Sequence, residues 1–228
     1  MTSRRDERAA RRAELSGAGP VRGEHIPMRF PGVTGGFALF GEVLMVGLLV
    51  TVGGILLVTL PAALAAGIRH LRRYLNAEGS PQRQFWRDYL KALPGGLVVG
   101  VVGLVLVGLL ILDIDLANSG ALPGGTVVAL VGWVGLAAVA VTLLTAAGAW
   151  VPAPAGPASE AEPHTGWRAA LRSVPASFAG DITGVLFLVA TAVFVCVLTW
   201  VLVPLVIPAL GCAALAVIAV PERRRRAR

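Results

Sequence analysis

The longest apolar run in the chain covers residues 182–220 and contains no charged side chain. As one straight helix it would be about 58 Å long, nearly twice the ~30 Å hydrocarbon thickness of a bilayer. A soluble core in a chain of 228 residues could not bury such a run. We therefore expect a hairpin near Trp200, Pro204 and Pro208, because proline lacks a backbone donor and is best accommodated in a turn or a first helical turn.

Three further apolar runs, at residues 37–60, 95–112 and 127–150, are each long enough to cross a bilayer. Only 14% of the chain is charged and its mean hydropathy is +0.76, whereas average soluble proteins are about 25% charged. The sequence therefore predicts an all-α, polytopic transmembrane helical bundle of about five spans over residues 37–220. The predicted spans are 37–60, 95–112, 127–150, 182–203 and 204–220.

The two ends of the chain are polar. Residues 1–36 are rich in Arg, Glu and Ala and lack apolar periodicity, which predicts a disordered, charged N-terminal tail. Residues 221–228 form a basic C-terminal tail. The first apolar run is longer than the 7–15 residues typical of a signal-peptide core, so we expect it to remain in the mature protein.

The net charge of +7 comes from basic residues that cluster at the ends of apolar runs, which indicates membrane topology and argues against a nucleic-acid-binding protein. Thirteen of the 20 Lys and Arg residues fall on one side if the N-terminus is outside and the C-terminus is cytoplasmic. We therefore expect the lipid bilayer to be the main partner of the chain. All but one of the basic residues are arginine, which is typical of GC-rich bacteria, so the predicted location is a bacterial cell (plasma) membrane.

Residues 86–94 and 167–175 share a pattern of Trp, Arg, Leu, a basic residue and Pro, and each precedes a predicted span. Their apolar positions follow helical periodicity, which predicts amphipathic interfacial helices before spans two and four that turn into the membrane at Pro94 and Pro175. A true duplication and a chance similarity between two pre-span segments both stay open. The residues expected to face interfacial lipid are Arg69, Arg72, Arg73, Trp86, Arg87, Lys91, Trp167, Arg168 and Arg172.

Glu42 lies five positions into the first apolar run, where a carboxylate is costly unless it faces a polar interior. Asp113 and Asp115 end the second run, and with Glu42 and Trp200 they form a candidate polar vestibule on the outer side. The alternatives are a Glu42 side chain that reaches the interface and ordinary solvated acids in a loop.

Catalytic and metal-binding motifs are absent from the sequence: it has no His-Glu-x-x-His, Gly-x-Ser-x-Gly, phosphate-binding Gly-Lys loop or Cys-x-x-Cys. His25, His70 and His164 lie far apart in polar segments and are expected at solvated surface positions. We therefore predict no enzyme, no cofactor and no metal site.

The segment 59–74, the Phe-Trp-Arg-Asp motif at 85–88 and the glycine-rich entry to the second run, up to about Leu112, resemble the YesL-like family of small bacterial membrane proteins. That family is a domain of unknown function, so no site residues carry over. The resemblance implies an accessory role in carbohydrate uptake, with a carbohydrate ABC transporter permease as the partner.

Two functions follow from these observations. The first is a non-enzymatic membrane accessory or assembly factor associated with carbohydrate uptake. The second is a small transporter or channel that uses Glu42 and the outer acidic vestibule.

Overall fold

The structure is a computed structural model that describes residues 36–78, 81–120, 124–153 and 165–226. The chain divides into two units, Met1–Pro31 and Gly32–Arg228, and every described residue belongs to the second. The predicted tail at 1–36 lies outside the described residues apart from its last residue, and the C-terminal tail is described only as far as residue 226.

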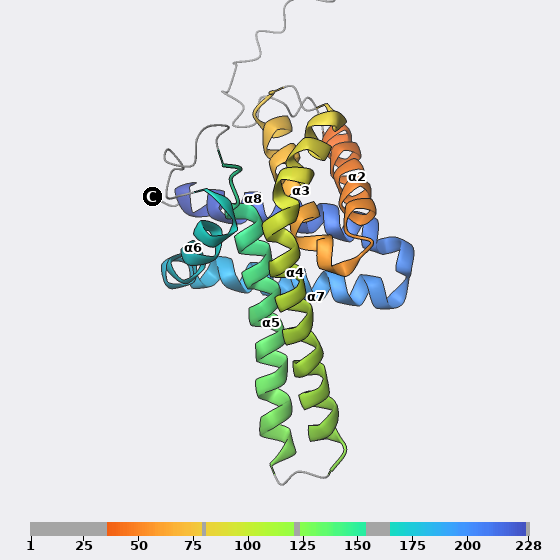
Figure 1. The fold of residues 1–228 in the computed structure, drawn as a ribbon, viewed down its shortest axis with the longest axis vertical. Helices are drawn as coiled ribbons and strands as arrows, with labels where there is room; N and C mark the ends of the chain where they lie inside the picture. The colour runs from red at the N-terminus through yellow and green to blue at the C-terminus, as the bar shows by residue number, and fades with distance from the viewer. Residues whose placement is uncertain (1–35, 79–80, 121–123, 154–164, 227–228) are drawn as a thin grey trace, which may run out of the picture. The chain divides into compact units, whose positions relative to one another are not determined.

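The described residues are helical, and their elements follow one another as a chain of helices (Figure 1). The elements are α2 (Gly36–Gly53), the 3-10 turn η1 (Leu57–Thr59), α3 (Leu60–Leu75), α4 (Gln82–Asn118), α5 (Gly125–Ala149), α6 (Gly166–Gly180), α7 (Ile182–Val201), the 3-10 turn η3 (Val203–Leu205) and α8 (Val206–Arg226). Among them α2, α4, α5, α7 and the segment Val203–Arg223 are long and apolar enough to cross a membrane. The prediction of an all-α, multi-pass membrane protein is confirmed.

The first predicted span, 37–60, is wrong as one helix, because α2 ends at Gly53 and the chain turns back there. The hydroxyl of Thr59 donates to the carbonyls of Gly53 and Leu56 at 2.7 and 2.8 Å, which closes the turn. Pro61 then lies in the first turn of α3, where the missing backbone donor costs nothing. The residues of this turn are mostly apolar, so a hydropathy profile alone does not reveal it.

Helix α3 lies at the centre of the described unit and contacts α2, α4, α5 and α8. Its residues 61–68 are all buried, although the sequence analysis placed this segment outside the spans. Small side chains make this possible, since Gly53 of α2 packs on Ala63, and Gly96 of α4 packs on Ala62. Small residues let helix backbones approach closely, as they do in membrane bundles.

Helix α4 continues through Pro94 as a single helix of 37 residues, so the expected turn at Pro94 is wrong. At 1.5 Å per residue it is about 56 Å long, and its first turns extend well beyond a hydrocarbon layer of about 30 Å. The second amphipathic segment is a separate helix, α6, and its turn lies at Asp181, not at Pro175. There the Asp181 carboxylate caps α7 by accepting from the Gly184 amide at 2.8 Å.

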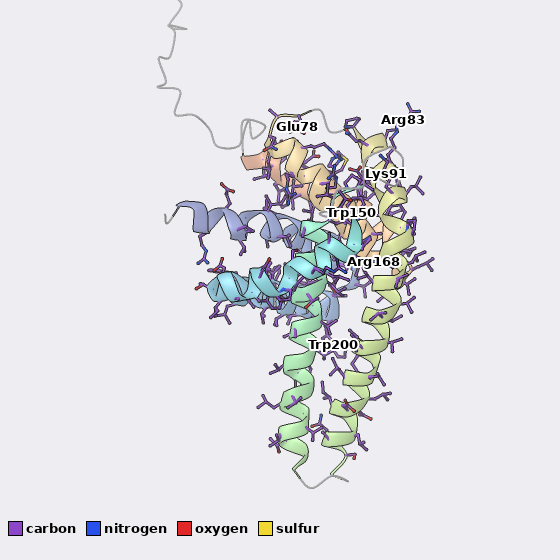
Figure 2. All side chains as sticks on the ribbon, turned by 60° about the vertical axis from the view of Figure 1, so that its left-hand side comes forward. Glu78, Arg83, Lys91, Trp150, Arg168 and Trp200 are labelled. Carbon is purple, nitrogen blue, oxygen red and sulfur yellow. The ribbon has the colours of Figure 1, made fainter. Side chains whose placement is uncertain are left out.

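Two helical hairpins differ in direction. In Figures 1 and 2, α4 and α5 run side by side, while α7 and α8 run across them. The α2 and α8 backbones touch at Gly47 and Gly211, where a Cβ atom would collide with the Ile207 or Val43 carbonyl.

Candidate functional site

Glu42 is paired with a histidine that the sequence analysis expected at the surface. The Glu42 Oε1 atom lies 2.8 Å from Nε2 of His70, and the two side chains are 14% and 1% exposed. Glu42 lies near the start of α2 and His70 near the end of α3, so these two helices run antiparallel. A buried carboxylate needs a partner, and here an imidazole supplies it.

A second ion pair lies next along α3. The Asp88 carboxylate on α4 accepts from Nη1 of Arg73 at 2.8 Å and from Nε of Arg69 at 3.3 Å. The Asp88 and Arg73 side chains are only 9% and 11% exposed, and that of Arg69 is 26% exposed. We call Glu42, His70, Arg69, Arg73 and Asp88 the charge cluster. It joins α2, α3 and α4 at one end of the described unit.

Arg72 connects the same end of α3 to α5. Its guanidinium donates to the Gly148 carbonyl at 3.2 Å, while Arg69 lies 5.8 Å from the ring centre of Trp150. The pKa of Arg72 is lowered from its ordinary value, first because neighbouring protein removes water from the guanidinium and second because Arg69 repels its charge. Three arginines in five residues are thus held by one carboxylate, one carbonyl and one aromatic ring.

Aromatic residues enclose the cluster. The buried Phe85 ring lies edge-on to His70 at 6.5 Å and stacks on Tyr89 at 6.3 Å. The Tyr89 hydroxyl donates to the Gly53 carbonyl at 2.8 Å, and the Trp167 indole donates to the Ala92 carbonyl at 2.8 Å. These bonds attach α4 to α2 and to α6.

Some hydrogen-bonding capacity in the cluster is unused by protein groups. Nδ1 of His70 and the Nε and Nη2 atoms of Arg73 are buried without a protein partner in the part of the chain that the structure describes. Buried polar atoms usually find a partner, and ordered water is the common one. Within the same residues, no group of three His, Cys, Asp or Glu side chains could hold a metal ion.

The predicted vestibule is not formed. Asp113 and Asp115 are exposed near the end of α4, and Asp113 lies about 38 Å along that helix from Asp88. Trp200 is 92% exposed at the end of α7. Glu42 lies instead beside the α3 residues that pair with Asp88, so the structure does not bring these four residues together.

The residues predicted to face interfacial lipid divide into two groups. Arg72, Arg87, Lys91, Arg168 and Arg172 are exposed, and Trp86 is 38% exposed. Arg69 and Arg73 are engaged by Asp88, and Trp167 is buried against α4, so the prediction is wrong for Arg73 and Trp167. Sequence reasoning missed His70, Asp88 and Phe85. The one available signal was that a carboxylate in an apolar helix requires a partner.

The chain matches no protein-family model, no curated protein and no solved structure.

Proposed function

We propose that this chain is a non-enzymatic membrane accessory or assembly factor that docks onto another membrane protein. The observation that carries the proposal is Trp133, which lies within α5 and is 61% exposed. It is about 12 Å from the start of that helix, among other exposed apolar side chains. Hydrocarbon offers the indole N–H no acceptor, whereas a neighbouring protein helix does.

The charge cluster supports a scaffold role. Its ionic groups are paired within the chain, and the rings of Phe85 and Tyr89 beside it stack on each other. Truncating one partner of a buried ion pair is strongly destabilising, so such a cluster fixes how α2, α3 and α4 are joined. A rigid junction at one end leaves the apolar sides of α5 and α7 to contact lipid and partner.

The proposed partner class is the permease of a carbohydrate ABC transporter, and this part rests on the family resemblance. The test is coexpression of the tagged full chain with such a permease, followed by purification in mild detergent. We expect the permease to be retained, and Trp133→Ala to release it while the neighbouring Val134→Ala control does not. A permease that is never retained, or is retained equally by both variants, would contradict the proposal.

A second candidate, a small transporter or channel, is favoured by one observation. In the Glu42–His70 pair the imidazole is buried, the carboxylate is 14% exposed, and one ring nitrogen has no protein partner among the described residues; such a pair could serve as a proton relay. Reconstituted vesicles should then show cation or sugar flux that is lost in Glu42→Gln and His70→Gln and kept in Glu78→Gln, because Glu78 is exposed. Absence of flux from the unaltered chain would refute it.

We propose an orientation for the first helix that differs from the predicted one. The Glu42–His70 contact puts the start of α2 at the same end of the bundle as the end of α3, whereas the predicted topology had placed them on opposite sides. The Lys and Arg residues between 69 and 91 favour the cytoplasm for this end, which puts the start of α2 there too.

Labelling of introduced cysteines in bacterial cells with a membrane-impermeant maleimide tests this orientation. Cys196 and Cys212 are exposed and are first replaced by alanine. Gly36→Cys and Glu78→Cys should both be protected, and Asp115→Cys should react. Opposite behaviour of the first two positions would contradict the shared end.

A further inference from the structure

A groove with apolar walls lies where α6 crosses the α4–α5 hairpin. It has a volume of about 360 Å³, and all but one of its lining residues are apolar. Its walls include Val98, Val102, Leu106, Ala138, Thr142 and Leu171. The lower part of the hairpin lies below α6 (Figures 1 and 2). The lining residues on α4 extend from Val98 to Leu106, so the groove runs from Leu171 of α6 along the hairpin.

The rim of this groove on α6 is basic. Arg168, Leu171 and Arg172 occupy spacings i, i+3 and i+4, so they share one exposed side of α6, and Leu171 also lines the groove. Side chains at this spacing are neighbours on a helix surface. Two exposed arginines therefore lie on the same side of α6 as the groove-lining Leu171.

A third cation lies on α4. Lys91, Gly95, Val98 and Val102 follow the spacing of one helix face, and Trp167 of α6 packs on Gly95. Lys91 is exposed and lies about 10 Å along α4 from Val98, beyond the Trp167 contact. Figure 2 shows Lys91 above Arg168. The acidic residue on the neighbouring turn, Asp88, is already neutralised by Arg69 and Arg73.

We propose that this groove and its rim form a binding site for an anionic phospholipid. An acyl chain lies in the groove, and the phosphate is held by Lys91, Arg168 and Arg172. The apolar groove matches the acyl chain of that lipid, and the cations at one end of the groove match its phosphate. Arginine is suited to phosphate because its planar fork donates two parallel hydrogen bonds. The site is independent of the permease proposal.

The test is native mass spectrometry of the purified full chain equilibrated with phosphatidylglycerol or phosphatidylcholine in separate micelles. We expect the chain to retain phosphatidylglycerol preferentially. Each basic residue near an anionic headgroup contributes about 1 kcal/mol, so the triple variant Lys91→Gln, Arg168→Gln, Arg172→Gln should weaken retention by on the order of a hundredfold. A control triple variant that changes residues 224, 225 and 226 from Arg to Gln removes the same charge elsewhere and should leave retention unchanged.

A second arm tests the groove itself. Ala138→Phe fills it and should reduce retention of phosphatidylglycerol, whereas Val127→Phe, on an exposed position outside the lining, should not. Equal retention of the two lipids, unchanged retention in the triple variant, or no effect of Ala138→Phe would overturn the proposal. Crosslinking of two chains through Ala138→Cys would overturn it too, because a second copy would then occupy the groove.

Discussion

Replacing Asp88 by asparagine should be the most damaging single polar substitution in the charge cluster. The carboxylate is 9% exposed and holds two guanidinium groups at 2.8 and 3.3 Å. Removal of its charge leaves Arg73, which is 11% exposed, without a counter-charge. Breaking a buried pair in this way costs about 3–5 kcal/mol of unfolding free energy. We expect the lower half of that range, because Arg69 is 26% exposed and keeps its contact with Trp150.

The assay is unfolding of the purified chain in mixed micelles of mild detergent and increasing dodecyl sulfate, followed by tryptophan fluorescence. Asp115→Asn is the matched control, because Asp115 is exposed and its replacement should stay within about 0.5 kcal/mol of the unaltered chain. Adding Arg73→Met to Asp88→Asn should restore part of the loss by removing the unpaired buried charge. Equal midpoints for Asp88→Asn and Asp115→Asn, or no recovery in the double variant, would refute the ion-pair reasoning.

Two further substitutions test the packing. Gly47→Val should separate α2 from α8 and lower the free energy of unfolding by roughly 1–3 kcal/mol or more, the cost of overpacking. In the control Gly108→Val the added side chain meets open space. Equal thermal unfolding midpoints of the two variants would contradict the close approach of α2 and α8. Trp167→Phe removes the hydrogen bond to the Ala92 carbonyl and should lower the free energy of unfolding by about 1 kcal/mol. The control Trp133→Phe should not lower it in the purified chain. Similar unfolding midpoints of the two variants in detergent would argue against the buried indole hydrogen bond.

Hydropathy predicts the candidate spans well, because a stretch such as 127–150 has no other stable environment, and α5 covers Gly125–Ala149. It fails at α3. That helix carries three arginines and a histidine, so a window of average hydropathy excludes it, although residues 61–68 are all buried. Its Ala and Gly content, with Pro61 in the first turn, was the available signal for close packing.

The candidate site could be predicted only in part. Glu42 stands out because a carboxylate within an apolar run is costly. Its partner, His70, is 28 positions away, and only the reversal of the chain after Gly53 brings the two together. The pairing of Asp88 with Arg69 and Arg73 depends in the same way on how α3 lies against α4. Local periodicity carries no information about which side chains of distant helices meet, so such pairs can be identified only once the fold is known.

Helix α3 is short and strongly basic at its end. The translocon inserts nascent segments according to their apolar character, so we expect it not to insert α3 as a span. Its surroundings are completed only when α5 and α8 have been made, and α8 is the last helix of the described chain to be synthesised. We therefore expect α3 to wait near the membrane surface during translation and to reach its final place late. A ribosome stalled before α8 should then leave α3 accessible to an added protease, and α3 should become protected once the full chain is released.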